Sequence, residues 1–336
     1  MSEFVKWSIS TILTYRVCPR KFYLAHILAD ARAKDPLRRQ AHWLKKTINL
    51  EMWAGVLVDK AINAWVIPKL AQKQVPDFTQ VEELAIDMAR RQFAFSKQHR
   101  YRTESESKAG DNFLILDIHE LGAAYEKADL ELVSHRVRQA IRNLPTLTLP
   151  NGQLLLDFLL AADWLLANVQ DRHIVIGKAN INPQIDLLVG YPSRQIVFDW
   201  KVSDSKTANY ERQLLVIGTL IYRKRKQEGG WAYQFSDIQL LEANLLNGHV
   251  KEHVLGEDTY QQTVDYITLT ATDVDLMRAS RKPNQIPIDE FAFTESDYAC
   301  NTCPFYSLCN YLYQQPDEFN PAHYAEFVSL AQSVSH

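Results

Sequence analysis

Three short segments rich in β-branched and aromatic residues follow one another between residues 173 and 202. They constrain the fold more than any other feature of the chain. They are HIVIGKANI (173–181), IDLLVGY (185–191) and RQIVFDWKV (194–202), separated by Asn182-Pro183 and by Pro192-Ser193. Segments of this length and composition, bounded by turn residues, predict β-strands. We therefore expect three neighbouring strands of one sheet.

Helical patterns lie on both sides of this predicted sheet. An Asn-Gly pair at 247–248 separates DIQLLEANLL from VKEHVL and predicts a hairpin. The order of helices, sheet, helix, hairpin and helix predicts an α/β fold, in which a mixed sheet is flanked by helices and preceded by a helical insertion. The segments whose apolar residues predict helices are 8–28, 50–70, 79–100, 112–142, 154–169, 208–227 and 257–281.

Two of the predicted strands carry charged residues among apolar ones. Asp186 lies in QIDLLVG, and Asp199 and Lys201 lie in IVFDWKV. Buried strands rarely contain charges unless these are paired or bind metal. Asp199 and Lys201 point to one sheet face, and Asp186 lies beside Asp199 if the strands are neighbours. Such carboxylates suit Mg²⁺ or Mn²⁺, and the lysine could orient a metal-bound water for phosphodiester hydrolysis. An Asp–Lys ion pair at a strand end is the alternative.

The chain has four cysteines, three of them in the segment CNTCPFYSLC. Cys300, Cys303 and Cys309 belong to this segment, and Cys18 lies near the other end of the chain. Four thiolates suit an iron–sulfur cluster or structural Zn²⁺, and unligated core thiols are a third interpretation. A cytoplasmic location is expected because no signal-peptide core is present, and thiols stay reduced there, which argues against disulfides.

The charge of the 336-residue chain is unevenly distributed, although the net charge is only −3. Nine Lys or Arg against two Asp lie between Arg16 and Lys46, whereas seven acidic residues and no basic ones follow Lys282. This asymmetry suits an anionic ligand, with a solvated basic helix as the alternative. No uncharged apolar run is long enough to span a membrane, so no membrane partner is expected.

Taken together, the motifs resemble those of PD-(D/E)XK nucleases, and within them the iron–sulfur RecB-type group, which includes the CRISPR-associated exonuclease family and the nuclease domain of AddB. The matching segments are SISTILTYRVCPRKF, IDLL with Asp186, VFDWK with Asp199 and Lys201 followed by Gln213, and CNTCPF. They follow the family's order over nearly the whole chain. The stretch between about 66 and 172 matches no motif.

The resemblance implies a restriction-endonuclease-like fold and a metal-dependent deoxyribonuclease of exonuclease or flap-processing type. Asp186 and Asp199 would bind the metal, Lys201 would position the attacking water, and Gln213 would orient the lysine or the DNA backbone. Cys18 and the three tail cysteines would hold a [4Fe–4S] cluster, with Zn²⁺ as the alternative, and would join the chain ends. The implied setting is DNA repair, recombination, or CRISPR spacer processing in antiviral defence, with a helicase or CRISPR integrase subunit as partner.

Three departures from the family pattern put catalysis in question. Asp59 stands where a metal-binding histidine is expected, and it is a possible third metal ligand. Ile217 stands where the Gln-x-x-x-Tyr pattern has tyrosine, and Pro183-Gln184 replaces a common glycine. The alternative function is therefore a weakened or inactive nuclease-fold subunit that binds DNA or scaffolds a helicase or integrase complex.

Basic and aromatic residues around Cys18 are of the kinds that contact phosphates and stack on unpaired bases. The resemblance implies that their ligand is DNA that is single-stranded or has single-stranded ends. The candidate nucleic-acid-binding residues are Tyr15, Arg20, Lys21, Arg38 and Arg39. By role, we expect an N-terminal helical part with the first cysteine (1–65), a helical insertion (66–172), a nuclease core (173–282) and a cluster-binding tail (283–336).

Overall fold

The computed structural model describes residues 4–170, 173–204, 210–229, 233–278, 281–282, 285–314 and 319–334. The chain forms two compact units, each assembled from separate segments. The first, which we call the sheet unit, comprises Met1–Ile9, Glu51–Ala89 and Ala128–Met277. The second, the cysteine unit, comprises Ser10–Leu50, Arg90–Lys127 and Arg278–His336. The predicted parts 1–65, 66–172, 173–282 and 283–336 divide the chain by role, and that division stays a prediction.

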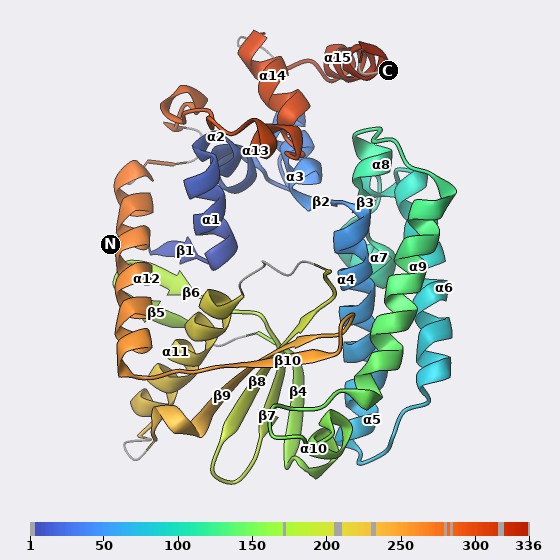
Figure 1. Ribbon diagram of the computed structural model, residues 1–336. Helices are drawn as coiled ribbons and strands as arrows, with labels where there is room; N and C mark the ends of the chain where they lie inside the picture. The colour runs from blue at the N-terminus through green and yellow to red at the C-terminus, as the bar shows by residue number, and fades with distance from the viewer. Residues whose placement is uncertain are drawn as a thin grey trace. The chain divides into compact units, whose positions relative to one another are not determined.

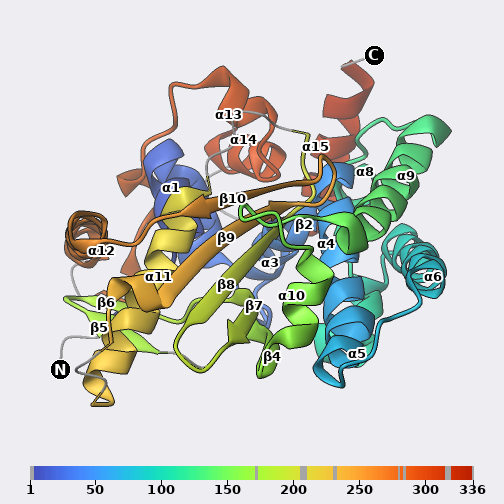
Figure 2. The ribbon, with the colours of Figure 1, turned by 60° about the horizontal axis from the view of Figure 1, so that its bottom comes forward.

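The sheet unit contains a five-stranded mixed sheet (Figures 1 and 2). Its order is β10-β9-β8-β7-β4; β8 and β9 are parallel and the other neighbours are antiparallel. The predicted α/β class and the hairpin at Asn247-Gly248 are both confirmed. The strands are β4 (Trp164–Val169), β7 (Ile185–Gly190), β8 (Gln195–Lys201), β9 (Ile238–Asn244) and β10 (His249–His253).

Helix α11 (Glu211–Gln227) covers one face of this sheet, as Figure 2 shows. Its buried side chains pack against apolar residues of the strands, and the cluster includes Leu214, Ile217, Ile221, Leu188, Val197 and Leu240. Burial of an apolar helix stripe on a sheet is what stabilises such a pair of layers. The first two residues of the predicted helix 208–227 lie outside the described residues.

The apolar segment 154–169 is not one buried helix, so this prediction is wrong. Helix α10 (Leu155–Ala161) ends before Asp163, and strand β4 begins at Trp164 and pairs with β7. An apolar run fits a buried strand as well as a buried helix, and its periodicity does not separate the two. Hydrogen bonding to β7 makes the second part of the run, Trp164–Val169, a strand.

The prediction that 173–181 is one strand beside the strand 185–191 is also wrong. It forms two short strands, β5 (Ile174–Ile176) and β6 (Ala179–Ile181), which turn at Gly177. Gly177 has a φ of +55°, a conformation that glycine adopts without strain. Both strands belong to a separate three-stranded sheet of order β1-β6-β5, in which β1 spans Val5–Trp7. The indole Nε1 of Trp7 anchors β1 by donating to Thr270 Oγ1 at 2.9 Å.

Most predicted helices are present with shifted ends. The segment 50–70 forms α4 (Leu50–Ala61), a π-helical stretch (Ile62–Val66) and α5 (Ile67–Ala71), while 79–100 is largely α6 (Phe78–Lys97). The predicted helix 112–142 is wrong in its first part: β3 (Ile115–Leu116) and α8 (Asp117–Glu120) precede α9 (Lys127–Asn143). Helix α12 (Glu257–Arg278) covers 257–281 except its end, where 279–280 lie outside the described residues.

In the cysteine unit, the predicted helix 8–28 is interrupted at Cys18. Cys18 has an extended backbone (φ −154°, ψ 103°) and is the N-cap of α2, so the helical structure stops after α1 and starts again with α2. Pro19 at the first position of α2 fits this start because proline is tolerated there. Other elements of this unit are α1 (Ile9–Val17), α2 (Pro19–Phe22), a π-helix (Tyr23–Leu28), α3 (Pro36–Lys46), β2 (Thr47–Ile48), α7 (Glu106–Ala109), α13 (Asp297–Asn301), α14 (Tyr306–Gln314) and α15 (Pro321–Val334).

Candidate active site and cysteine site

The two candidate aspartates lie side by side on adjacent strands of the sheet unit. Strands β7 and β8 are antiparallel neighbours, and the pair Leu187↔Phe198 places Asp186 opposite Asp199 one step further along. Residues opposite each other in neighbouring strands point to the same face. Asp186 Oδ2 accepts a hydrogen bond from the Trp200 amide at 3.0 Å. The sheet register therefore brings the two carboxyl groups together.

Lys201 and Gln213 both contact Asp199, whose exposed fraction is only 2%. Lys201 Nζ forms an ion pair with Asp199 Oδ2. Gln213 Nε2 donates to Asp199 Oδ1 at 2.9 Å. Gln213 can reach because it lies in the first turn of α11, whose next residue, Leu214, is packed on the sheet. The four candidate catalytic residues thus gather at one end of the face that α11 covers.

Asp59 approaches the same carboxylates from helix α4. Its Oδ1 accepts a hydrogen bond from Asn63 Nδ2 at 3.0 Å. Burial raises the pKa of Asp59, and the charge of Asp199 raises it further. Asp59 in turn raises the pKa of Asp186. A carboxylate therefore stands in the sheet unit where the resemblance led us to expect a histidine.

Burial and mutual repulsion make these carboxyl groups hard to ionise together. Burial, then Asp199, then Asp59 raise the pKa of Asp186 to about 7. Burial also raises the pKa of Asp199, against the lowering effect of Lys201. Clustered buried carboxyl groups behave in this way when no cation offsets their charge. The electrostatics therefore favour a bound cation.

The donor chemistry fits a hard divalent ion, although the ligands are few. Among the described residues, no group of three or more His, Cys, Asp or Glu side chains lies in an arrangement that could hold a metal ion. Mg²⁺ needs no full protein cage, since one or two carboxylates plus waters and substrate phosphates suffice. Asp186 and Asp199 are the two carboxylates that match this requirement, with Asp59 nearby.

Three residues near Asp199 were missed by sequence reasoning. Glu242 pairs with Asp199 in the parallel register of β8 and β9, and its charge raises the pKa of Asp199. His253 Nε2 lies 2.9 Å from Glu242 Oε2, and its imidazole is 1% exposed. Lys201 Nζ lies 4.0 Å from the ring centroid of Tyr210. A charged residue inside the apolar strand IQLLEAN was the available signal, the same signal that identified Asp186.

The tyrosine that the resemblance to the RecB-type group led us to expect at position 217 is absent. Ile217 is buried in the apolar cluster beneath α11. Tyr222, five residues further on, stacks on Phe235 with ring centroids 4.1 Å apart. Both positions serve packing in the described residues, so the aromatic ring beside Lys201 comes from Tyr210.

The four cysteines all belong to the cysteine unit, and none is in a disulfide. The charge of Cys18 contributes to the raised pKa of Cys303 and of Cys309. No three of the cysteines, all of which the structure describes, lie in an arrangement that could hold a metal ion. Burial raises the pKa of the Cys303 thiol and raises that of Cys309 to about 11. The Lys21 amide donates a hydrogen bond to Cys18 Sγ at 3.3 Å. Against the effect of burial, the Phe305 amide lowers the pKa of Cys303, and Arg20 lowers that of Cys309. Donors of this kind fit thiolates that ligate a metal centre.

The candidate nucleic-acid residues of the cysteine unit differ in exposure. Arg39 is exposed, and its guanidinium carbon lies 5.3 Å from the ring centroid of Trp43. Arg38 donates to Leu28 O and pairs with Asp30. Lys21 and Tyr15 are half-buried. Arg20, by contrast, is buried, so its guanidinium is not presented to a phosphate.

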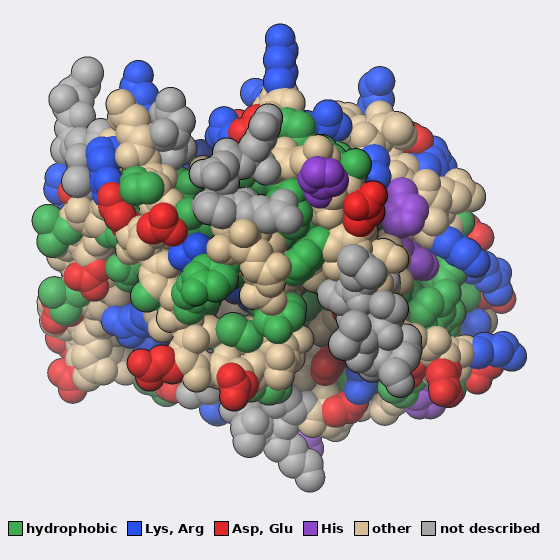
Figure 3. Space-filling model, turned by 90° about the horizontal axis from the view of Figure 1, so that it is seen from above, with side chains coloured by type: hydrophobic (Ala, Val, Ile, Leu, Met, Phe, Trp, Pro, Cys, Tyr) green, Lys and Arg blue, Asp and Glu red, His purple; other side chains and the backbone are tan. Residues whose placement is uncertain are grey.

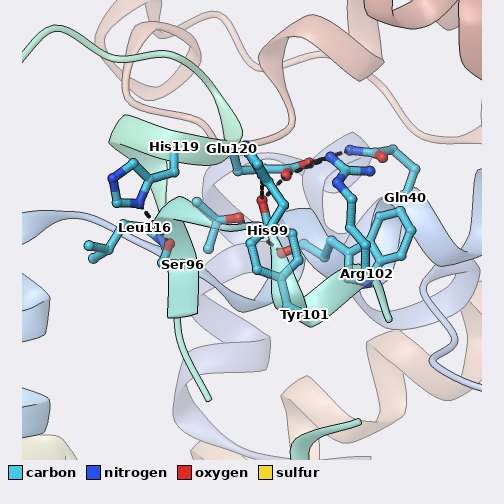
Figure 4. A network of polar contacts seen from close by, with 10 residues as sticks. Gln40, Ser96, His99, Tyr101, Arg102, Leu116, His119 and Glu120 are labelled. Carbon is cyan, nitrogen blue, oxygen red and sulfur yellow. Dashed lines mark hydrogen bonds and ion pairs between the residues drawn. The ribbon is translucent and has the colours of Figure 1, made fainter. Parts of the chain in front are cut away.

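A second cation, Arg102, lies over the Trp43 ring. Figure 4 shows that the carboxylate of Glu120 holds it. Arg102 Nη2 donates to both oxygens of Glu120, at 2.9 and 2.7 Å, and its carbon lies 4.6 Å from the Trp43 centroid. Glu120 also accepts from Tyr101 Oη and from Gln40 Nε2. Figure 3 shows Lys and Arg side chains standing out at several points among acidic and hydrophobic ones. No helix among the described residues is long and apolar enough to cross a bilayer.

A mixed sheet with two aspartates and a lysine at the ends of adjacent strands is the arrangement expected of the restriction-endonuclease-like class. The family model of the PD-(D/E)XK nuclease superfamily matches residues 6–310, and the chain belongs to this superfamily. No curated protein matches the chain. A solved structure titled "Crystal structure of SSO0001" is similar over 91% of this chain and 98% of that chain, with 12% identity and a TM-score of 0.25. A likeness at that level carries no argument about function.

Proposed function

We propose that the chain is a Mg²⁺- or Mn²⁺-dependent deoxyribonuclease that trims DNA ends or flaps. The observation that carries the proposal is the meeting of Asp186, Asp199 and Lys201 at one end of the sheet face. Membership of a nuclease superfamily supports the same chemistry. The cation would be held by Asp186 and Asp199, with Asp59 as a third candidate, and would polarise the phosphate and lower the pKa of a bound water.

The protein's own side chains have distinct parts in this proposal. Lys201, held by Asp199 and beside the Tyr210 ring, would position the attacking water and offset negative charge on the phosphate in the transition state. Gln213, fixed on Asp199 Oδ1, would keep that carboxylate in place. Burial of Asp199 excludes bulk water and strengthens these contacts.

We further propose that the four cysteines hold a [4Fe–4S] cluster that staples the cysteine unit. The support is the placement of all four cysteines in one compact unit and the hydrogen bond from the Lys21 amide to Cys18 Sγ. DNA with single-stranded ends is the proposed substrate, in repair, recombination or CRISPR spacer processing. A helicase or integrase subunit is the proposed partner, and the cytoplasm the proposed location.

The test is cleavage of labelled single-strand, duplex and flap DNA during a titration of Mg²⁺ or Mn²⁺, with Lys201→Ala as the variant. Lys201→Ala is expected to lower the cleavage rate by at least about 100-fold because a transition-state contact is lost. Its DNA affinity, measured without divalent metal, should change little. Lys251→Ala is the matched control, because Lys251 is exposed on β10 of the same sheet. Equal rates for Lys201→Ala and wild type would refute the assignment.

The alternative is a weakened or inactive nuclease-fold subunit that binds DNA or scaffolds a complex. Asp59 at the histidine position and the buried Ile217 favour it. Under this alternative, cluster-loaded protein binds DNA but shows no metal-dependent cleavage, and Lys201→Ala changes nothing.

A further inference from the structure

Two arginines from distant parts of the sequence meet over one indole ring of the cysteine unit. The guanidinium carbon of Arg102 lies 4.6 Å from the ring centroid of Trp43, and that of Arg39 lies 5.3 Å from it. Arg39 and Trp43 are four residues apart on α3, whereas Arg102 ends a 3-10 helix (Arg100–Arg102) in the stretch that matches no motif. Guanidinium groups at such distances are attracted to the face of an indole. We call Arg39, Trp43 and Arg102 the Arg–Trp surface.

A carboxylate with almost no solvent exposure holds Arg102 in this place (Figure 4). The side chain of Glu120, the last residue of α8, is 1% exposed and accepts two hydrogen bonds from Arg102 Nη2. Gln40 Nε2, on α3, donates to Glu120 Oε1 at 2.8 Å, and Tyr101 Oη donates to Glu120 Oε2 at 2.6 Å. Glu120 therefore ties Arg102 to the helix that carries Trp43.

The backbone also keeps the two arginine-bearing segments together. Strand β2 (Thr47–Ile48) follows α3 directly and pairs in parallel with β3 (Ile115–Leu116), which directly precedes α8. The half-buried Trp43 packs against a buried apolar cluster that contains Phe95 and Tyr101. Because contacts within the protein fix these side chains, a ligand would not have to order them on binding.

The carboxylate that holds this surface does not balance its charge. Arg39 and Arg102 carry two positive charges and Glu120 carries one negative charge, so their sum is +1. The Arg102 side chain remains 40% exposed, and Arg39 is exposed as well. Both hydrogen bonds to Glu120 come from Nη2, one corner of a guanidinium that has five N–H donors. An ion pair that only stabilised the fold would need neither the second arginine nor the indole.

We propose that the Arg–Trp surface binds a nucleotide of single-stranded DNA, with the phosphate at the two guanidinium groups and the unpaired base against the indole and guanidinium planes. Arginine suits both contacts because its planar fork matches phosphate oxygens and stacks on rings. Stacking accepts any base, so unpaired DNA is preferred with little dependence on sequence. Glu120 is a positioning residue, since it acts through Arg102. The proposal rests on the DNA substrate of the proposed function and adds a contact from outside the recognised motifs.

The experiment measures the affinity of the full-length protein for a labelled oligothymidylate and for a blunt duplex of equal length. Fluorescence anisotropy is recorded at several salt concentrations and without divalent metal. Leaving out the metal keeps the measurement independent of cleavage. Urea unfolding establishes that each variant is folded.

The first variant combines Arg102→Gln with Glu120→Gln, so that the net charge is unchanged and no buried carboxylate is left unpaired. Its affinity for the single strand should fall about tenfold, and the slope of log affinity against log salt should fall by about 1. Arg281→Gln combined with Glu290→Gln is the matched control. Arg281 donates to both oxygens of Glu290, at 2.6 and 2.5 Å, in the same unit. This control should bind both DNAs as wild type does.

The second variant, Trp43→Leu, removes the ring. It should weaken single-strand binding about tenfold and duplex binding little, because stacking needs an unpaired base. Trp43→Phe, which keeps a smaller ring, should lie between Trp43→Leu and wild type. If Trp43→Leu does not fold, Arg39→Gln, an exposed change on the same surface, is measured instead and should also weaken single-strand binding.

Wild-type affinity for the single strand in the Arg102→Gln/Glu120→Gln and Trp43→Leu variants overturns the proposal and leaves the nuclease assignment intact. Equal losses on single strand and duplex also overturn it. Poly-glutamate that competes as well as the oligothymidylate would show a simple anion site, with the same consequence. Wild-type protein that binds no DNA contradicts the proposed substrate, and the proposal falls with it. The expected binding pattern without any metal-dependent cleavage would contradict the nuclease assignment alone.

Discussion

The carboxyl group of Asp199 meets a different polar partner on each oxygen, Gln213 at Oδ1 and Lys201 at Oδ2. Glu242 on β9 raises the pKa of Asp199, and the His253 imidazole on β10 lowers it. A group so placed has its protonation and its orientation set by neighbours rather than by solvent. We therefore expect single substitutions of these neighbours to change the metal dependence of cleavage more than the free energy of unfolding.

Asp59→Asn tests whether the carboxylate at the histidine position assists the cation. The change removes a negative charge that acts on Asp186, so the metal concentration for half-maximal cleavage should rise about tenfold or more. Asp157→Asn, an exposed change on α10, should leave that concentration unchanged. The measurement is a Mn²⁺ titration of the cleavage rate. An unaltered half-maximal concentration in Asp59→Asn would remove Asp59 from the site.

His119 gives the cysteine unit a pH-dependent stability. Burial, with the charges of His99 and Lys97, lowers the pKa of His119 to about 4. Its Nδ1 contacts Ser96 Oγ at 2.9 Å, and its Nε2 is buried without a partner among the described residues (Figure 4). The unfolded chain takes up the proton near pH 6.5 and the folded chain only near 4, so the free energy of unfolding falls as the pH drops across this window.

In His119→Gln that contribution disappears, so the variant should lose less stability than wild type between pH 6.5 and 4.5. Urea unfolding at several pH values measures the difference. His135→Gln, at an exposed position of α9, is the control and should follow wild type. Parallel pH profiles for His119→Gln and wild type would contradict the assignment.

Among the elements, the pairing of β4 with β7 depends on one close approach. Gly190 lies opposite Trp164, and a Cβ added to Gly190 would be 1.8 Å from the indole ring. The contact with Trp164 therefore requires glycine at position 190, although glycine is otherwise unfavourable inside a strand because it has no side chain to pack. The same contact explains why the apolar run 154–169 ends as a strand beside β7.

Gly190→Ala should lower the free energy of unfolding by about 1–3 kcal/mol or more, because the strand or the indole must move. Gly55→Ala in α4 should instead raise it by up to about 1 kcal/mol, since no atom lies within 4 Å of the added Cβ and alanine favours helix. Denaturant unfolding followed by tryptophan fluorescence compares the two. An unchanged free energy of unfolding in Gly190→Ala would show that β4 and β7 can move apart without cost.

For the whole molecule, a net charge of −3 means that attraction to DNA must come from local groups. Arg39 is the exposed candidate of the basic segment, while Arg38 is paired with Asp30 and Lys46 with Glu106. Arg39→Gln should weaken DNA binding and reduce the slope of log affinity against log salt by about 1. Lys69→Gln, an equal charge change at an exposed site of the sheet unit, should leave the slope unchanged. Binding titrations at several salt concentrations decide between them.

The sequence alone determined the fold class, the hairpin at Asn247-Gly248 and most helices, because apolar spacing and turn residues act locally. It also placed Asp186 near Asp199, since charges inside apolar strands are exceptional and the strands were expected to be neighbours. Tertiary structure alone decided which strands share a sheet: 173–181 joined β1, and 164–169 became β4. It also buried Arg20 and set Glu242 beside Asp199. These outcomes depend on contacts between residues far apart in the chain, where pairing and burial outweigh local preference.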